Sequence, residues 1–113
     1  MLPDDAFATR DSVLFLDVRE YYEWDAGHIE GAVHIPLRHL PTNFGSLDPE
    51  RTIVVACQIG QRSELAADFL RQRGFDAHNL EGGMTLWASK GLPFVSGGGP
   101  EGEVVDGWAQ TLE

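Results

Sequence analysis

Short runs of apolar residues alternate along the chain with segments whose apolar residues recur every three or four positions. The runs are too short for helices and end at polar residues or proline, so they predict buried strands over residues 13–18, 31–36, 52–56 and 77–80. The helically spaced segments predict helices over residues 4–9, 20–26, 63–73 and 84–89. Residues 37–47 share this spacing but contain Pro41 and Gly45, which predicts a broken helix.

This alternation of near-continuous apolar strands with helices predicts an α/β fold, with a mainly parallel central sheet covered by helices on both faces. The chain has 113 residues, which is enough for one compact domain. We expect that domain to span residues 1–95. A Gly-rich linker and a short acidic tail over residues 96–113 are expected to follow it.

Composition restricts the partners and the compartment. The net charge of −10 argues against nucleic acid and favours a basic partner protein. The apolar runs are far shorter than the roughly 20 residues that span a bilayer, and the acidic start does not resemble a secretory signal. We therefore expect a cytoplasmic protein without a membrane segment. Its single cysteine, Cys57, excludes an internal disulfide and fits a reducing compartment.

Cys57 lies between the clearest predicted strand and the clearest predicted helix. In parallel sheets ligands bind beyond the carboxyl ends of the strands, and a loop at such a place can direct backbone N–H groups and a helix N-terminus at an anion. A thiolate would be stabilised there. Gly60 permits a tight turn, Arg62 supplies a positive fork for an anionic ligand, and Ser63 is a helix cap or an anion donor. Gln58, Ile59 and Gln61 would contribute their backbone N–H groups.

Three motifs together resemble the rhodanese-like family of single-domain sulfurtransferases. The segment Cys57-x-x-Gly60-x-Arg62-Ser63 is similar to the active-site loop of that family. The family's N-terminal signature resembles Asp17-Val18-Arg19-Glu20-x-x-Glu23-Trp24-x-x-Gly27-His28-Ile29-x-Gly31-Ala32-x-His34-Ile35-Pro36. Its C-terminal signature resembles Leu80-Glu81-Gly82-Gly83-Met84-x-x-Trp87. The likeness covers about residues 13–94 and keeps the family's order of motifs.

The resemblance implies a three-layer α/β fold and transfer of a sulfane sulfur from a small donor such as thiosulfate. Cys57 would be the nucleophile and would carry the sulfur as a persulfide, which the amides of the loop over residues 57–63 stabilise. Cyanide, a thiol or a partner protein would accept the sulfur, because the chain has no second thiol to release it. Neither a metal nor an organic cofactor is implied.

Two features depart from the family pattern. Gln58, Ile59 and Gln61 are neutral where members that favour thiosulfate often carry basic residues, so thiosulfate is expected to be a poor or surrogate donor. Only twelve residues precede the predicted strand at Val13, so the family's first edge strand is expected to be lost or shortened.

Two other functions remain open. One is a rhodanese-like interaction or persulfide-sensing module with little turnover, which an acidic surface would suit. The other is a cysteine-based phosphatase or arsenate reductase, which is disfavoured because those enzymes have a Cys-x5-Arg loop whereas Arg62 stands five positions after Cys57.

The remaining charged and aromatic residues are interpreted as structural. Asp17, Arg19 and Glu23 are expected to pair with one another at the end of a buried strand. His28 and His34 lack further ligands at metal-binding spacing and are interpreted as hydrogen-bonded structural histidines. Trp24 and Trp87 are assigned to the core or to a pocket wall.

Overall fold

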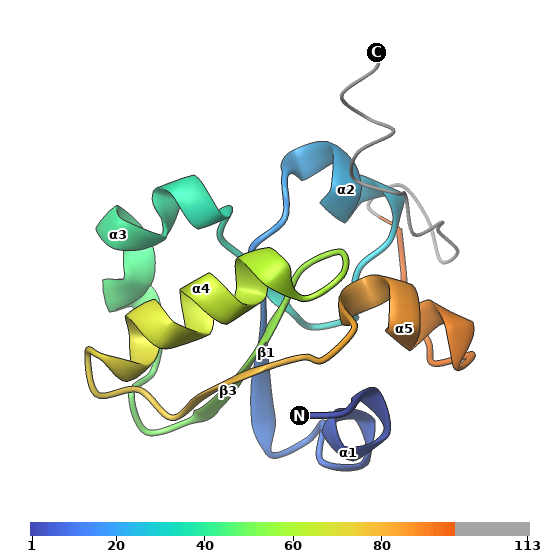
Figure 1. The fold of residues 1–113 in the computed structure, drawn as a ribbon, viewed down its shortest axis with the longest axis horizontal. Helices are drawn as coiled ribbons and strands as arrows, with labels where there is room; N and C mark the ends of the chain where they lie inside the picture. Colours follow the sequence, from blue (N-terminus) through green and yellow to red (C-terminus); the bar gives the residue numbers. More distant parts are fainter. Residues whose placement is uncertain (97–113) are drawn as a thin grey trace.

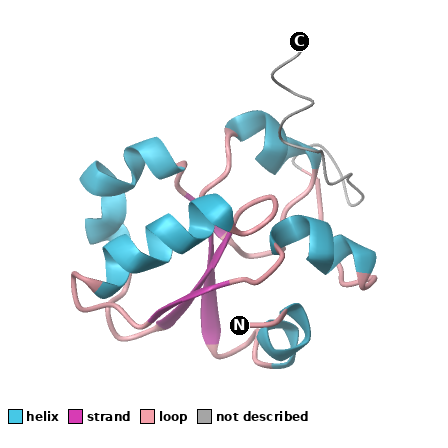
Figure 2. Cartoon of the chain, in the orientation of Figure 1, coloured by secondary structure: helices cyan, strands magenta, loops and turns pink. Residues whose placement is uncertain are grey.

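The computed structural model describes residues 1–96 of the chain and shows an α/β fold in three layers (Figures 1 and 2). Four parallel strands form the central sheet in the order β2-β1-β3-β4. The elements along the chain are α1 (Pro3–Ala8), β1 (Val13–Asp17), α2 (Tyr21–Ala26), β2 (Val33–His34), η1 (Leu37–His39), α3 (Leu40–Asn43), η2 (Phe44–Ser46), β3 (Thr52–Ala56), α4 (Gln61–Arg71), β4 (Ala77–Asn79) and α5 (Gly83–Ser89).

The two faces of the sheet are covered by different helices, because alternate residues of a strand point to opposite faces. On one face, Ile53 and Val55 of β3 pack with α4 and with the segment from η1 to η2. On the other, Val54 and Ala56 pack with α1 and α5 around the buried Trp87. Figure 1 shows α3 and α4 on one side of the sheet and α1 and α5 on the other. The predicted α/β fold with both faces covered is confirmed.

Most predicted elements differ by one or two residues from their limits in the structure, and three of them illustrate the differences. Strand β2 contains only Val33–His34 of the expected residues 31–36. The chain still follows β1 beyond it, because the amides of Ile35 and Leu37 donate to the carbonyls of Asp17 and Val18, but the intervening Pro36 has no N–H to donate. Helix α4 begins two residues before the expected Ser63. The broken helix over residues 37–47 is confirmed as two 3-10 turns flanking one turn of α-helix.

The family's first strand, which is expected to be lost or shortened here, would be an edge strand, and β4 forms one edge of the sheet. In residues 1–96 no strand precedes α1. Met1 lies at this edge instead: its amino group donates to the carbonyl of Asn79 at 2.7 Å, and its carbonyl accepts from the amide of Glu81 at 2.9 Å. Met1 thus makes two backbone hydrogen bonds at this edge, and the loss or shortening of the edge strand stays a prediction.

The domain limits remain a prediction, because the structure describes residues 1–96 and not the rest of the chain. In the described part of the chain, the regular helices and the parallel sheet lie between Pro3 and Ser89, within the domain expected over residues 1–95. Nearly all of the linker and tail expected over residues 96–113 lies outside the described residues. None of the helices in residues 1–96 is long and apolar enough to cross a membrane.

Candidate active site at Cys57

The carboxyl ends of the four strands meet at one edge of the sheet, and Cys57 follows the end of β3. Asp17 of β1 is paired with Ala56 on one side and with His34 on the other, and Asn79 of β4 is paired with Val55. The chain then turns through residues 57–60 into α4, and Gly60 begins the helix with a φ of +109° that favours glycine. This geometry places the loop between β3 and α4, as the sequence predicted.

The sulfur of Cys57 lies within the loop and has two hydrogen-bond donors. Its Sγ accepts from the backbone amide of Gly60 at 3.0 Å and from the hydroxyl of Ser63 at 3.2 Å. The residue is 1% exposed. Both donors would favour negative charge on the sulfur, because each directs a proton at it.

Two carbonyl groups of the loop, those of Cys57 and Gln58, are bound to α5. Met84 N donates to the Cys57 carbonyl at 2.8 Å, and Thr85 N donates to the Gln58 carbonyl at 3.0 Å. Glycine is required for this close approach: a Cβ on Gly83 would lie 2.5 Å from each of those two carbonyl oxygens. Gly83 of the third motif therefore allows two backbone segments to touch.

Several backbone amides of the loop have no acceptor among the residues that the structure describes. These are the N–H groups of Gln58, Ile59, Gln61, Arg62 and Ser63. The last three belong to the first turn of α4, where an α-helix leaves its N–H groups without intrahelical partners. The loop can therefore offer amide donors and the positive end of a helix dipole to an anion.

Gln58 has a side-chain role that the sequence analysis missed. Its side chain is buried, Oε1 accepts from Arg19 Nη1 at 3.1 Å, and Nε2 donates to Thr85 Oγ1 at 3.0 Å. Arg19 in turn donates through Nε and Nη2 to both carboxylate oxygens of Asp17 at 2.9 to 3.1 Å, and to the Gly27 carbonyl. The expected pairing of Asp17 with Arg19 is confirmed, and it supports the loop through Gln58.

Glu23 does not pair with Asp17 and Arg19, which corrects the expectation of a three-residue cluster. Its carboxylate, with a side chain 0% exposed, accepts two hydrogen bonds from the Arg62 guanidinium at 2.7 and 2.8 Å. Burial alone would raise the pKa of Glu23, but the hydrogen bonds from Arg62 and from the Glu20 amide outweigh it and hold that pKa below its ordinary value.

Arg62 is thus held by a carboxylate at the site. The hydrogen bond to Glu23 is the main cause that raises the pKa of Arg62, and the negative charge that Cys57 can carry adds to it. Its guanidinium is about one-third exposed and is close enough to the loop to affect the sulfur electrostatically. Its role as a clamp for an incoming anion stays a prediction.

Asn79 is the other residue at the site that sequence analysis missed. Its Oδ1 accepts from the Ser63 hydroxyl, and its Nδ2 donates to the Gly60 carbonyl at 3.2 Å. The one signal in the sequence was its position at the end of the last predicted strand, since the strand order that places β4 beside β3 cannot be read from spacing.

The two histidines of the second motif are structural in this geometry. The rings of His28 and His34 both stack on the Trp24 ring, at centroid distances of 3.5 and 4.7 Å. His28 Nδ1 is hydrogen-bonded to the Trp24 carbonyl, and His34 Nε2 to the Arg19 carbonyl. Within residues 1–96, no cluster of His, Cys, Asp and Glu side chains is suited to a metal ion.

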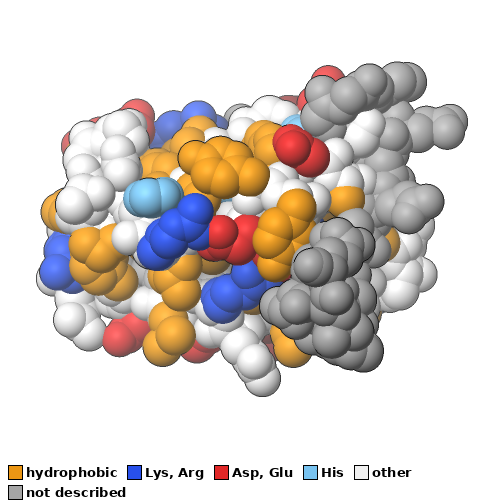
Figure 3. All heavy atoms as spheres, turned by 90° about the horizontal axis from the view of Figure 1, so that it is seen from above, with side chains coloured by type: hydrophobic (Ala, Val, Ile, Leu, Met, Phe, Trp, Pro, Cys, Tyr) orange, Lys and Arg blue, Asp and Glu red, His pale blue; other side chains and the backbone are white. Residues whose placement is uncertain are grey.

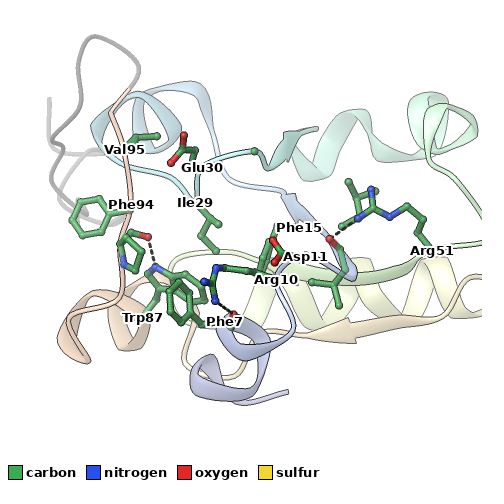
Figure 4. Close-up of a pocket in the computed structure, with 14 residues that line it drawn as sticks. Phe7, Arg10, Asp11, Phe15, Ile29, Glu30, Arg51, Trp87, Phe94 and Val95 are labelled. Atoms are coloured by element: carbon green, nitrogen blue, oxygen red, sulfur yellow. Dashed lines mark hydrogen bonds between the residues drawn. The ribbon is translucent and has the colours of Figure 1, made fainter.

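A pocket with both aromatic and charged lining residues lies apart from Cys57. It has a volume of about 360 Å³, and none of the loop residues 57–63 lines it. Figure 4 shows Phe7, Phe15, Ile29 and Trp87 around it, from α1, the middle of β1, the segment after α2, and α5. Trp87 is buried in the core and also lines this pocket, so it forms part of both. Its indole N–H donates to the Pro93 carbonyl at 2.9 Å.

Comparison with known proteins relates this geometry to a family. The model of the rhodanese-like domain matches residues 4–90. A sulfurtransferase of Allochromatium vinosum is 35% identical over 96 residues, which cover 84% of this chain and 87% of that protein. The thiosulfate sulfurtransferase GlpE of Stutzerimonas stutzeri is 32% identical over 87 residues, covering 75% of this chain and 80% of that protein.

A solved structure shows the same fold. The crystal structure of a rhodanese-related protein from Thermoplasma volcanium matches with a TM-score of 0.83 and 32% identity, over 84% of this chain and 95% of that one.

Proposed function

The chain belongs to the rhodanese-like family, and on that premise we propose that it transfers sulfane sulfur through a persulfide on Cys57. The observation that carries the proposal is the position of the Cys57 sulfur, which has two donors of its own inside a loop whose other amides have no partner in the described residues. Such a loop suits a sulfur atom that alternates between thiolate and persulfide, because both forms are anions.

The first half-reaction would be attack by the Cys57 thiolate on the outer sulfur of a donor. With thiosulfate, a new bond forms between Sγ and the sulfane sulfur while the S–S bond of thiosulfate breaks, and sulfite leaves with the electron pair of that bond. The product is a Cys57 persulfide whose terminal sulfur carries the negative charge. The amides of Gln58, Ile59, Gln61 and Arg62 are the groups that would receive this charge.

The second half-reaction would regenerate the thiolate. Cyanide, or a thiolate of a small molecule or partner protein, attacks the terminal sulfur, and the S–S bond of the persulfide breaks with its electron pair returning to Cys57. Release needs an external nucleophile because the chain has no second cysteine. We expect the protein to work in the cytoplasm, where thiols keep a lone cysteine reduced.

Exposed apolar side chains near the loop favour a protein as acceptor. Ile59 in the loop is 55% exposed, and Tyr22 of α2 and Leu65 of α4 are also exposed. Figure 3 views the molecule from above the orientation of Figure 1. Hydrophobic side chains are interspersed with basic and acidic ones on the surface that it shows. A protein acceptor could bury such side chains, whereas cyanide or a small thiol would leave them in water.

Mass spectrometry of the intact protein tests the proposal. Treatment with thiosulfate should add one sulfur, roughly 32 Da, and cyanide should remove it, since both steps occur at the thiolate. The Cys57→Ser variant should gain nothing. If thiosulfate, polysulfide and mercaptopyruvate all leave the mass unchanged, the transfer reaction is rejected and a partner-binding role takes its place.

A further inference from the structure

Asn79 contacts the loop of Cys57 without contacting the sulfur itself. It stands at the carboxyl end of β4, next to β3, and its side chain is hydrogen-bonded to both Ser63 and Gly60. These are the two residues whose hydroxyl and amide are hydrogen-bonded to Sγ. The orientation of the Asn79 amide is fixed by the Gly60 carbonyl, which requires the NH₂ group on its side and therefore the oxygen on the side of Ser63.

The hydroxyl of Ser63 has two acceptors but only one proton. Asn79 Oδ1 and Cys57 Sγ both lie within hydrogen-bond distance of Ser63 Oγ. When Cys57 is a thiol, its S–H can donate to Oγ while the hydroxyl donates to Asn79, so every group is satisfied. When Cys57 is a thiolate, the hydroxyl must turn to the sulfur, and Asn79 Oδ1 loses its donor.

From this competition we propose that Asn79 is a positioning residue that holds the Ser63 proton away from the sulfur and so limits the thiolate population of Cys57. It acts through Ser63 and does not touch the reacting atoms. This role rests on the proposed function, because the thiolate is the species that would attack the sulfur donor. As the thiolate forms, the Cys57 S–H bond breaks and its proton is released to solvent. The Ser63 O–H bond stays intact, and rotation about the Cβ–Oγ bond exchanges its hydrogen bond to Asn79 Oδ1 for one to the sulfur.

The charged groups around the site are the same in Ser63→Ala, in Asn79→Leu and in the variant that combines them. Arg62 of α4 is paired with Glu23 of α2, and Arg19 and Asp17 are paired behind the Gln58 side chain. Glu81, which follows β4, is exposed. Differences between variants that leave these groups in place therefore report on the hydrogen bonds of Ser63 and Asn79.

The test is the rate of Cys57 alkylation by iodoacetamide, measured from pH 5 to pH 9 on the full chain. Ser63→Ala removes a donor to the thiolate, so its rate at pH 6 should fall about tenfold and its profile should move to higher pH. Asn79→Leu frees the hydroxyl for the sulfur, so its rate should rise about threefold and its profile should move to lower pH. The Gly60 carbonyl also accepts from the Glu64 amide at 3.3 Å, so the leucine does not leave it without a donor.

The double variant separates this role from simple support of the loop. Because Asn79 acts through Ser63, the variant with both Ser63→Ala and Asn79→Leu should react like Ser63→Ala alone. If Asn79→Leu slows alkylation, or if the double variant is slower than Ser63→Ala, Asn79 merely supports the loop and the proposal is overturned.

A second substitution keeps the test usable if the leucine variant does not fold. Asn79→Asp provides a stronger acceptor for the Ser63 proton and adds negative charge, so it should slow alkylation. Unchanged or faster alkylation of Asn79→Asp would also overturn the proposal. Alkylation requires no sulfur donor, so its outcome is independent of whether thiosulfate loads Cys57 in the mass measurement.

Discussion

Replacing Gly83 by alanine should both destabilise the fold and impair the Cys57 loop. Gly83 has a φ of +58°, and a left-handed conformation costs a residue with a Cβ about 1–2 kcal/mol. The new Cβ would also lie 2.5 Å from the carbonyl oxygens of Cys57 and Gln58, and overpacking of this kind costs about 1–3 kcal/mol more. We therefore expect Gly83→Ala to lower the free energy of unfolding by about 2–5 kcal/mol.

Gly91→Ala is the matched control at the other end of α5. Gly91 has a φ of +73°, but an added Cβ would have no atom within 4 Å, so only the backbone cost of about 1–2 kcal/mol applies. Urea unfolding followed by tryptophan fluorescence gives both free energies. The difference between the two variants isolates the close approach of the loop to α5.

The same pair of variants should differ in sulfur loading. In Gly83→Ala the new Cβ would overlap the two carbonyl oxygens that accept from Met84 N and Thr85 N. The loop must therefore move away from α5. A displacement of about 1 Å can reduce a reaction rate by about a hundredfold, so we expect the folded variant to load sulfur from thiosulfate at least tenfold more slowly. Equal stability and equal loading of Gly83→Ala and Gly91→Ala would refute this reasoning.

Three further predictions concern stability. The pKa of Glu23 is lowered in the folded protein, so its contribution to stability is complete above its ordinary pKa of 4.5 and is lost as the pH falls through the lowered one. Glu23→Gln should therefore flatten the pH dependence of the free energy of unfolding in urea as the pH falls below 4.5, and an unchanged slope would contradict this. Asp17→Ala leaves Arg19 buried without its partner and should cost about 3–5 kcal/mol in thermal unfolding, while Asp17→Leu combined with Arg19→Met should recover most of it, and no recovery would count against the isolated charge as the cause. Trp87→Ala should cost about 3–5 kcal/mol, whereas Leu65→Ala, at a side chain that is 66% exposed, should stay within about 0.5 kcal/mol; equal costs would show that burial does not decide them.

The predicted elements that match the structure are those set by local signals. Strand β3 has the predicted limits at Thr52 and Ala56, because a continuous apolar run between polar residues specifies a buried strand. Strand β2 was predicted too long because Ile35 continues the hydrogen-bonded path without regular strand geometry. The pattern of apolar residues does not distinguish these two conformations.

In the candidate site, too, local arrangements were predicted and contacts between distant segments were not. The sequence indicated Cys57 and the loop to Ser63, because a cysteine between a strand and a helix is a local arrangement. It paired Glu23 with the wrong residues and missed Asn79, since both contacts join residues of the loop to elements distant in the sequence. The function of the loop residues remains a proposal that the mass and alkylation measurements address.

The sequence alone determined the alternation of strands and helices, the position of the cysteine at a strand end, and the glycine, Gly60, that permits the tight turn of its loop. These follow from periodicity and from the conformational limits of single residues, which act over a few positions. Only the tertiary structure decided that Arg62 binds Glu23 and that Asn79 shares the Ser63 proton with Cys57. Those partners depend on the strand order β2-β1-β3-β4, which brings the carboxyl ends of β1, β3 and β4 together and is set by burial of the whole sheet.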